Sequence, residues 1–160
     1  MSTTEIDTRF TERVVRRAVQ NVREGGKPFA CLVVRDGKVL VEATNQVAQS
    51  GDVTAHAEIS AIRLATEMGI TDLSGTDVYV TAYPCPMCLG ALYYAQPARV
   101  VFAASREQES EHYEDGNSLM TLDTFYDEYA KPVDERTLHA EQGPSEDATL
   151  PFREWSARQD

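Results

Sequence analysis

The chain has 160 residues, of which 42% are hydrophobic and 26% charged, and its formal net charge is −11. This length predicts one domain with one core over residues 1–160, and a net negative charge repels phosphates, which disfavours a nucleic-acid partner. No apolar run is long enough to cross a bilayer, and the polar, acidic residues 1–7 do not resemble a secretory signal, so we expect a cytoplasmic protein without a membrane partner.

Apolar spacing predicts an amphipathic helix at the start of the chain and a β-hairpin after it. The helix ends at the glycine pair 25–26, and two short apolar runs flank Asp36-Gly37, a favoured hairpin turn, within residues 29–44. The residues at helical spacing are Phe10, Val14, Val15, Ala18, Val19 and Val22.

The middle of the chain alternates between helical and strand patterns. Thr54 can cap a helix that runs to Gly69, and an apolar run at 78–80 predicts a strand. Pro86 can open a helix that ends at Ala95, and a further strand is expected at 100–102. This order predicts an α/β sandwich with a mixed sheet.

The pattern weakens after residue 105. Residues 106–116 are highly charged and are predicted to be a loop, whereas 121–129 and 152–159 are predicted to be helical. Phe152 and Trp155 stand three positions apart, a helical spacing that favours packing in the core.

The strongest chemical signal is His56-Ala57-Glu58 followed by Cys85-Pro86-Met87-Cys88. One imidazole and two thiolates provide three zinc ligands and leave the fourth tetrahedral position to a water or hydroxide, as in catalytic sites. Both groups begin predicted helices, where exposed N–H groups and the helix dipole favour thiolate over thiol. We therefore expect one Zn²⁺ per chain, bound by His56, Cys85 and Cys88.

Glu58 is the predicted catalytic residue. It lies two positions from His56, so the two side chains do not share a helix face and joint metal ligation is disfavoured. Its carboxylate can instead approach a metal-bound water from another side and transfer its proton.

These motifs resemble the cytidine deaminase superfamily, whose zinc members carry His-x-Glu followed by Pro-Cys-x-x-Cys. The resemblance covers residues 27–103, and Pro28-Phe29, Asn45 and the residues around both motifs are most similar to the bacterial guanine deaminase branch. Residues 131–137 are also similar to those enzymes. The resemblance implies a three-layer α/β/α sandwich with a mixed central sheet of about five strands.

The resemblance also implies a zinc-dependent hydrolytic deaminase. Such an enzyme removes the exocyclic amine of a nucleobase-like heterocycle, here guanine to xanthine plus ammonia, with Glu58 protonating the leaving nitrogen. Asn45 would hydrogen-bond the substrate, Phe29 would flank its ring and the backbone of Ala57 would contact its edge. Tyr83 stands where relatives usually have Glu, and its ring can reshape the pocket wall.

Residues 104–160 are expected to be a variable C-terminal part that completes the substrate pocket. Relatives place an acidic residue near the purine, for which Asp115 and Asp123 are candidates. In relatives the C-terminal segment, here including Trp155, closes the site, often from the partner subunit, so the resemblance predicts a homodimer.

Several alternatives stay open at this stage. The cysteine pair alone fits a redox motif, and a structural zinc site would need Cys31, His112 or His139 as a fourth ligand. Asn45, Phe29 and Tyr83 also fit ordinary turn, core and strand-end positions. The substrate could be cytosine, a pterin, an aminotriazine, a nucleoside or a tRNA adenosine, and the domain could be a regulatory module without catalysis.

Overall fold

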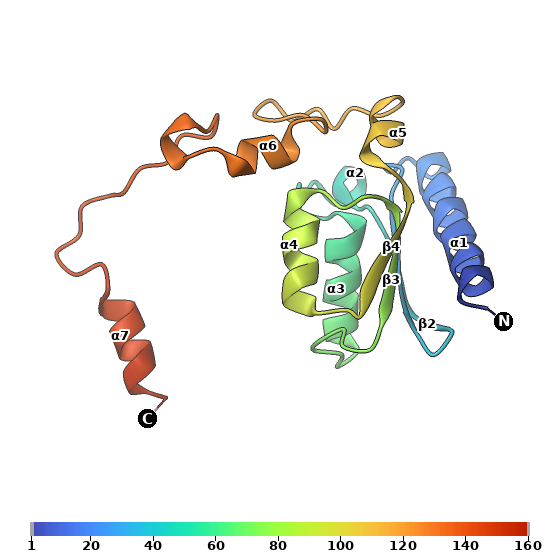
Figure 1. Cartoon of the computed structure of the whole chain (residues 1–160), viewed down its shortest axis with the longest axis horizontal. Coiled ribbons are helices and arrows are strands. Elements are labelled where there is room, and N and C mark those ends of the chain that lie inside the picture. Colours follow the sequence, from blue (N-terminus) through green and yellow to red (C-terminus); the bar gives the residue numbers. More distant parts are fainter. Residues whose placement is uncertain (1, 160) are drawn as a thin grey trace.

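A mixed four-stranded sheet lies between helices on both faces in the computed structural model, which describes residues 2–159 (Figure 1). The strand order is β2-β1-β3-β4, with β1 antiparallel to both neighbours and β3 parallel to β4. The strands are β1 (Ala30–Arg35), β2 (Lys38–Thr44), β3 (Asp77–Ala82) and β4 (Arg99–Ala104). The sandwich and its mixed sheet are confirmed, but the sheet of the described chain has four strands rather than about five.

The hairpin between β1 and β2 forms as predicted. Asp36 and Gly37 have positive φ values of 51° and 70°, which is the backbone conformation of a type I′ turn. This turn fixes the pairing that places the end of β2, and the Asn45 that follows it, beside the start of β1.

Helix α1 (Thr3–Arg23) covers one face of the sheet. It begins earlier than the apolar spacing indicates because Ser2 and Glu5 form a capping box that satisfies the first backbone N–H groups. Its buried residues are Phe10, Val14, Ala18 and Asn21. Val15, Val19 and Val22 are exposed, so only part of the periodic set faces the core.

An ion-pair cluster ties α1 to the sheet. The Arg99 guanidinium donates to both carboxylate oxygens of Asp7, at 2.9 and 2.7 Å, and to Asp77 at 2.9 Å. The Tyr79 hydroxyl donates to Asp7 at 2.7 Å. These contacts lower the pKa of Asp7, with the Arg99 hydrogen bonds as the largest cause.

Helices α3 (Ala57–Glu67) and α4 (Pro86–Ala95) cover the opposite face. The buried positions of α3 include Ala57, Ala61 and Ala65, whose small side chains let the helix lie close to the sheet. The N-cap of α3 is His56 and not Thr54, because Thr54 donates its hydroxyl to Asp52 in the preceding turn. A short helix, α2 (Val47–Ser50), precedes that turn.

The segment after β4 begins with a helix, although a loop was predicted for 106–116. Ser105 and Gln108 form a capping box that starts α5 (Arg106–Ser110), and the rest of the segment is irregular. The remaining helices are α6 (Phe125–Ala130), the 3₁₀ helix η1 (Val133–Glu135) and α7 (Leu150–Ala157).

The C-terminal part extends away from the sandwich and ends in α7 (Figure 1). Phe152 and Trp155 are 71% and 66% exposed there, so the predicted core packing of this pair is wrong for the isolated chain. None of the helices in residues 2–159 is long and apolar enough to span a membrane.

Candidate metal centre and substrate pocket

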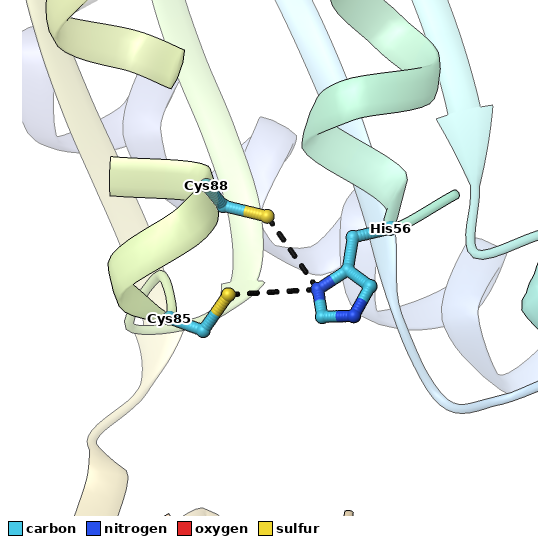
Figure 2. A group of neighbouring side chains, drawn as sticks. All are labelled: His56, Cys85 and Cys88. Carbon is cyan, nitrogen blue, oxygen red and sulfur yellow. Dashed lines mark hydrogen bonds between the residues drawn. The ribbon is translucent and has the colours of Figure 1, made fainter. Parts of the chain in front are cut away.

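The three predicted zinc ligands come from the first residues of two neighbouring helices (Figure 2). His56 is the N-cap of α3 and Cys85 the N-cap of α4, and both have extended backbones and make no side-chain capping bond. Cys88 lies in the first turn of α4, which Pro86 opens. The two helix starts therefore direct one imidazole and two sulfurs at a common point.

The distances between these ligand atoms fit a zinc ion. The His56 Nδ1 atom lies 3.5 Å from the Sγ atoms of both Cys85 and Cys88. Tetrahedral zinc with ordinary Zn–N and Zn–S bond lengths separates such atoms by about 3.6 Å. This agreement, together with the donor set, shows that the three residues can hold a zinc ion with three protein ligands.

The environment favours the thiolate form of Cys85. Hydrogen bonding from Cys88 is the largest cause that lowers the pKa of Cys85 to about 5, and His56 lowers it further. The backbone N–H of Cys88 at the start of α4 also contributes. A thiolate at neutral pH is the form that binds zinc.

The candidates for a fourth protein ligand lie elsewhere. Cys31 is buried in β1, and the side chains of His112 and His139 are 85% and 84% exposed. Within residues 2–159, the only metal-ligand group of histidine, cysteine and acidic side chains is the predicted one. A closed structural site therefore does not form from the described residues.

Glu58 lies beside the zinc site without belonging to its ligand group. It is in the first turn of α3, is 8% exposed, and borders a pocket together with His56 and Cys85. Burial is the largest cause that raises the pKa of Glu58. The carboxyl group thus lies in the pocket wall next to two of the candidate metal ligands.

The same pocket brings together most of the predicted substrate residues. Phe29, Asn45, Tyr83 and Asp115 all line it. The residues that sequence reasoning missed are Ala82, Pro84, Arg106, Glu109, Tyr113, Leu122 and Phe125. Most of them follow β4, where the only local signal was the capping box of Ser105 and Gln108.

Asn45 combines a turn role with a position in the pocket. Its Oδ1 atom accepts a hydrogen bond from the Val47 N–H at 3.0 Å, which leaves the amide NH₂ as the part of the side chain that can donate to a ligand. Its backbone is held on both sides: its N–H donates to the Phe29 carbonyl and its carbonyl accepts from Asn21 Nδ2. The side chain is therefore fixed before any ligand enters.

Aromatic rings and one acidic side chain form the rest of the wall. Phe29 and Tyr113 pack edge to face with ring centroids 5.0 Å apart, and Tyr83 packs in the same way on Phe102 at 5.1 Å. Asp115 accepts a hydrogen bond from the Tyr113 hydroxyl at 3.2 Å and lies 3.7 Å from Lys27 Nζ.

Three predicted residues do not border this pocket. Asp123 is exposed and lines a neighbouring depression, and Trp155 is on the distant helix α7. Ala57 is fully buried between His56 and Glu58, so only its backbone is available to a ligand.

Comparison with known proteins agrees with this geometry. Residues 4–104 match the family model of the cytidine and deoxycytidylate deaminase zinc-binding region. The guanine deaminase of Bacillus subtilis (strain 168) is 38% identical over 148 residues, which are 91% of each chain. A tRNA-specific adenosine deaminase of Agrobacterium fabrum is 38% identical over 98 residues, covering 61% of this chain and 64% of that protein.

Solved structures show the same relationship. The crystal structure of guanine deaminase from Bacillus subtilis superposes with a TM-score of 0.84 at 35% identity, covering 98% of this chain and 95% of that one. A guanine deaminase structure from Nitrosomonas europaea gives a TM-score of 0.60 at 27% identity, covering 67% and 64%. The chain therefore belongs to the cytidine and deoxycytidylate deaminase family of zinc-binding proteins.

Proposed function

We propose that this chain is a guanine deaminase, a hydrolase that converts guanine and water to xanthine and ammonia. The observation that carries the proposal is the three-ligand zinc site with Glu58 beside it in one pocket. Similarity to the Bacillus subtilis guanine deaminase over nearly the whole chain supports guanine as the substrate.

Each group of the site has a role in this reaction. Zinc held by His56, Cys85 and Cys88 supplies Lewis acidity, which makes water an effective nucleophile near neutral pH. Glu58 accepts the proton of the attacking water at a carboxylate oxygen. It then donates that proton to the exocyclic nitrogen, which leaves the ring carbon as ammonia.

The pocket walls orient the ring. The amide NH₂ of Asn45 donates to a ring acceptor, the Phe29 ring packs against the flat heterocycle, and the Ala57 backbone contacts its edge. Asp115, held by Tyr113 and Lys27, is the acidic residue that accepts from a ring N–H. Tyr83 stands where relatives usually have Glu, and its ring, which packs on Phe102, forms part of the pocket wall.

We extend the proposal to the C-terminal part of the chain. Residues 104–160 complete the pocket of a single deaminase domain, and the extended segment with α7 packs on a second copy in a homodimer. The exposure of Phe152 and Trp155 supports this, because large apolar side chains that are exposed together on one helix ordinarily pack on a partner surface. The three free thiols support a reducing, cytoplasmic compartment.

The test is ammonia release by zinc-loaded protein of measured metal content. Guanine should be deaminated, whereas cytosine, isocytosine, pterins, aminotriazines and nucleosides should react much more slowly. A tRNA gel shift at low salt provides a second arm, in which the charge of −11 predicts no tight complex. No ammonia from guanine would disprove the proposal, and tight tRNA binding would favour the tRNA deaminases instead.

A further inference from the structure

Glu109 is a pocket residue to which the proposed reaction gives no role. It lies near the end of α5, is half-buried, and lines the same pocket as Glu58, Asn45 and Asp115. Among residues 2–159, no hydrogen bond or ion pair holds its carboxyl group. Asp115 differs in this respect, because Tyr113 and Lys27 both contact it.

The surroundings of Glu109 disfavour a charge that has no partner. Burial is the largest cause that raises the pKa of Glu109 to about 7, and the negative charges of Glu58, Cys85 and Asp115 raise it further. Arg106 also lines the pocket, but its guanidinium lies over the Tyr126 ring, 4.9 Å from the centroid. A zinc ion offsets part of this negative potential without giving Glu109 a hydrogen-bond partner.

The fold does not need a carboxyl group at this position. Helix α5 begins with the reciprocal bonds of Ser105 and Gln108, at 2.9 and 3.2 Å. All described hydrogen bonds of Glu109 are made by its backbone. Its N–H donates to the Ser105 carbonyl, and its carbonyl accepts from N–H groups that include those of His112 and Tyr113. An unpartnered acidic side chain that faces a ligand pocket is a group that a ligand can satisfy.

We propose that Glu109 is a specificity-determining residue that accepts a hydrogen bond from a ring N–H of the substrate. The proposal rests on the proposed function and names the feature of guanine that this chain selects. Apart from the reacting amine, guanine carries one N–H in each of its two rings, whereas cytosine carries a single ring N–H. Asp115 and Glu109 give the pocket two acceptors besides Glu58, which matches guanine and leaves one acceptor unpaired with cytosine.

The experiment measures rate and affinity in matched variants. Glu109→Gln removes the charge and keeps an acceptor, and Glu109→Ala removes both. Glu111→Gln makes the same change at the C-cap of α5, where the side chain is 71% exposed. Loss of a hydrogen bond to a charged group should lower kcat/KM for guanine about 10- to 100-fold in Glu109→Ala and less in Glu109→Gln. Glu111→Gln should match the wild type.

Measuring binding affinity tests the role of Glu109 separately from the proposed deaminase activity. Guanine binding is measured by calorimetry in zinc-loaded Glu58→Gln protein, with Glu109→Gln or Glu111→Gln added, while ammonia release by the wild type tests the reaction itself. The affinity for guanine should fall with the Glu109 change and not with the Glu111 change, and the affinity for cytosine should not fall with either. Melting temperatures should not fall in the Glu109 variants, because the group has no partner to lose. Equal guanine affinity in the two double variants would overturn the proposal, whatever the rate of the wild type.

Discussion

Asn21 lies in α1 and is 1% exposed, yet its side chain reaches the loop that carries Asn45. Its Nδ2 atom donates to the Asn45 carbonyl at 3.0 Å and to the Lys27 carbonyl at 2.8 Å. Its Oδ1 atom also accepts from Gln49 Nε2 at 3.2 Å. An Asn21→Leu substitution keeps a similar volume and removes all three bonds. We therefore expect it to weaken both the fold and the binding of substrate.

The exposed Gln49 side chain can bond to water instead, so the size of the effect follows from what the two carbonyls lose. The Asn45 carbonyl has no other donor among the described residues, and an unsatisfied buried acceptor costs about 1–3 kcal/mol. The Lys27 carbonyl still accepts from the Phe29 N–H at 2.9 Å, so its loss is about 1 kcal/mol. The sum of about 2–4 kcal/mol corresponds to a fall in Tm of about 5–15 °C for a chain of this size.

Thermal unfolding of zinc-loaded protein checks this prediction, and guanine kinetics check the link to the site. KM should rise more than kcat falls, because Asn45 would be held less firmly. Gln20→Leu is the matched control, since Gln20 is exposed on the same helix and its side chain bonds, among the residues described, to Glu24 alone. If Asn21→Leu melted within about 2 °C of the control, the reasoning about the Asn45 carbonyl would be refuted.

Three further predictions concern proton transfer by Glu58, zinc binding by Cys85 and the loss of stability at low pH. Glu58→Gln should keep stoichiometric zinc and lower kcat by about 10²- to 10⁴-fold, and unchanged ammonia release would contradict its proton-transfer role. Cys85→Ala should lose zinc by elemental analysis and melt at a lower temperature, and a chelator should lower the Tm of the wild type but not of this variant. The pKa of Asp7 is lowered in the folded protein by Arg99, so its stabilisation is present above the ordinary aspartate pKa of 3.8 and is lost as the pH falls below that value. The Tm difference between wild type and Asp7→Asn should therefore shrink on acidification, and a difference that is constant with pH would exclude this linkage.

The metal site could be predicted from the sequence because the ligand spacing and the helix starts are both local. His56 and Cys85 each precede a helix, and Pro86 marks the second start. The capping residue of α3 was predicted at Thr54, two positions too early, because Thr54 instead bonds to Asp52. That bond depends on the fold of the preceding turn, which no local pattern encodes.

The pocket wall after β4 could not be predicted in the same way. Helix α5 has only five residues and no buried side chain, so hydrophobic spacing gives no signal there. Glu109 was counted with a charged loop, although the tertiary structure places it in the wall of the pocket that Glu58 also lines. The number of strands was expected from the family resemblance alone, and the described sheet has four.

The use of His56 and Cys85 as N-caps has a consequence for how this protein tolerates change. Ser, Thr, Asp or Asn at either position would strengthen the isolated helix by about 1 kcal/mol, and would at the same time remove a zinc ligand. The metal-free chain therefore keeps two weak helix ends that selection for folding alone would remove. Homologues with better capping residues at positions 56 and 85 would accordingly be ones that no longer bind the metal but retain the α/β/α fold.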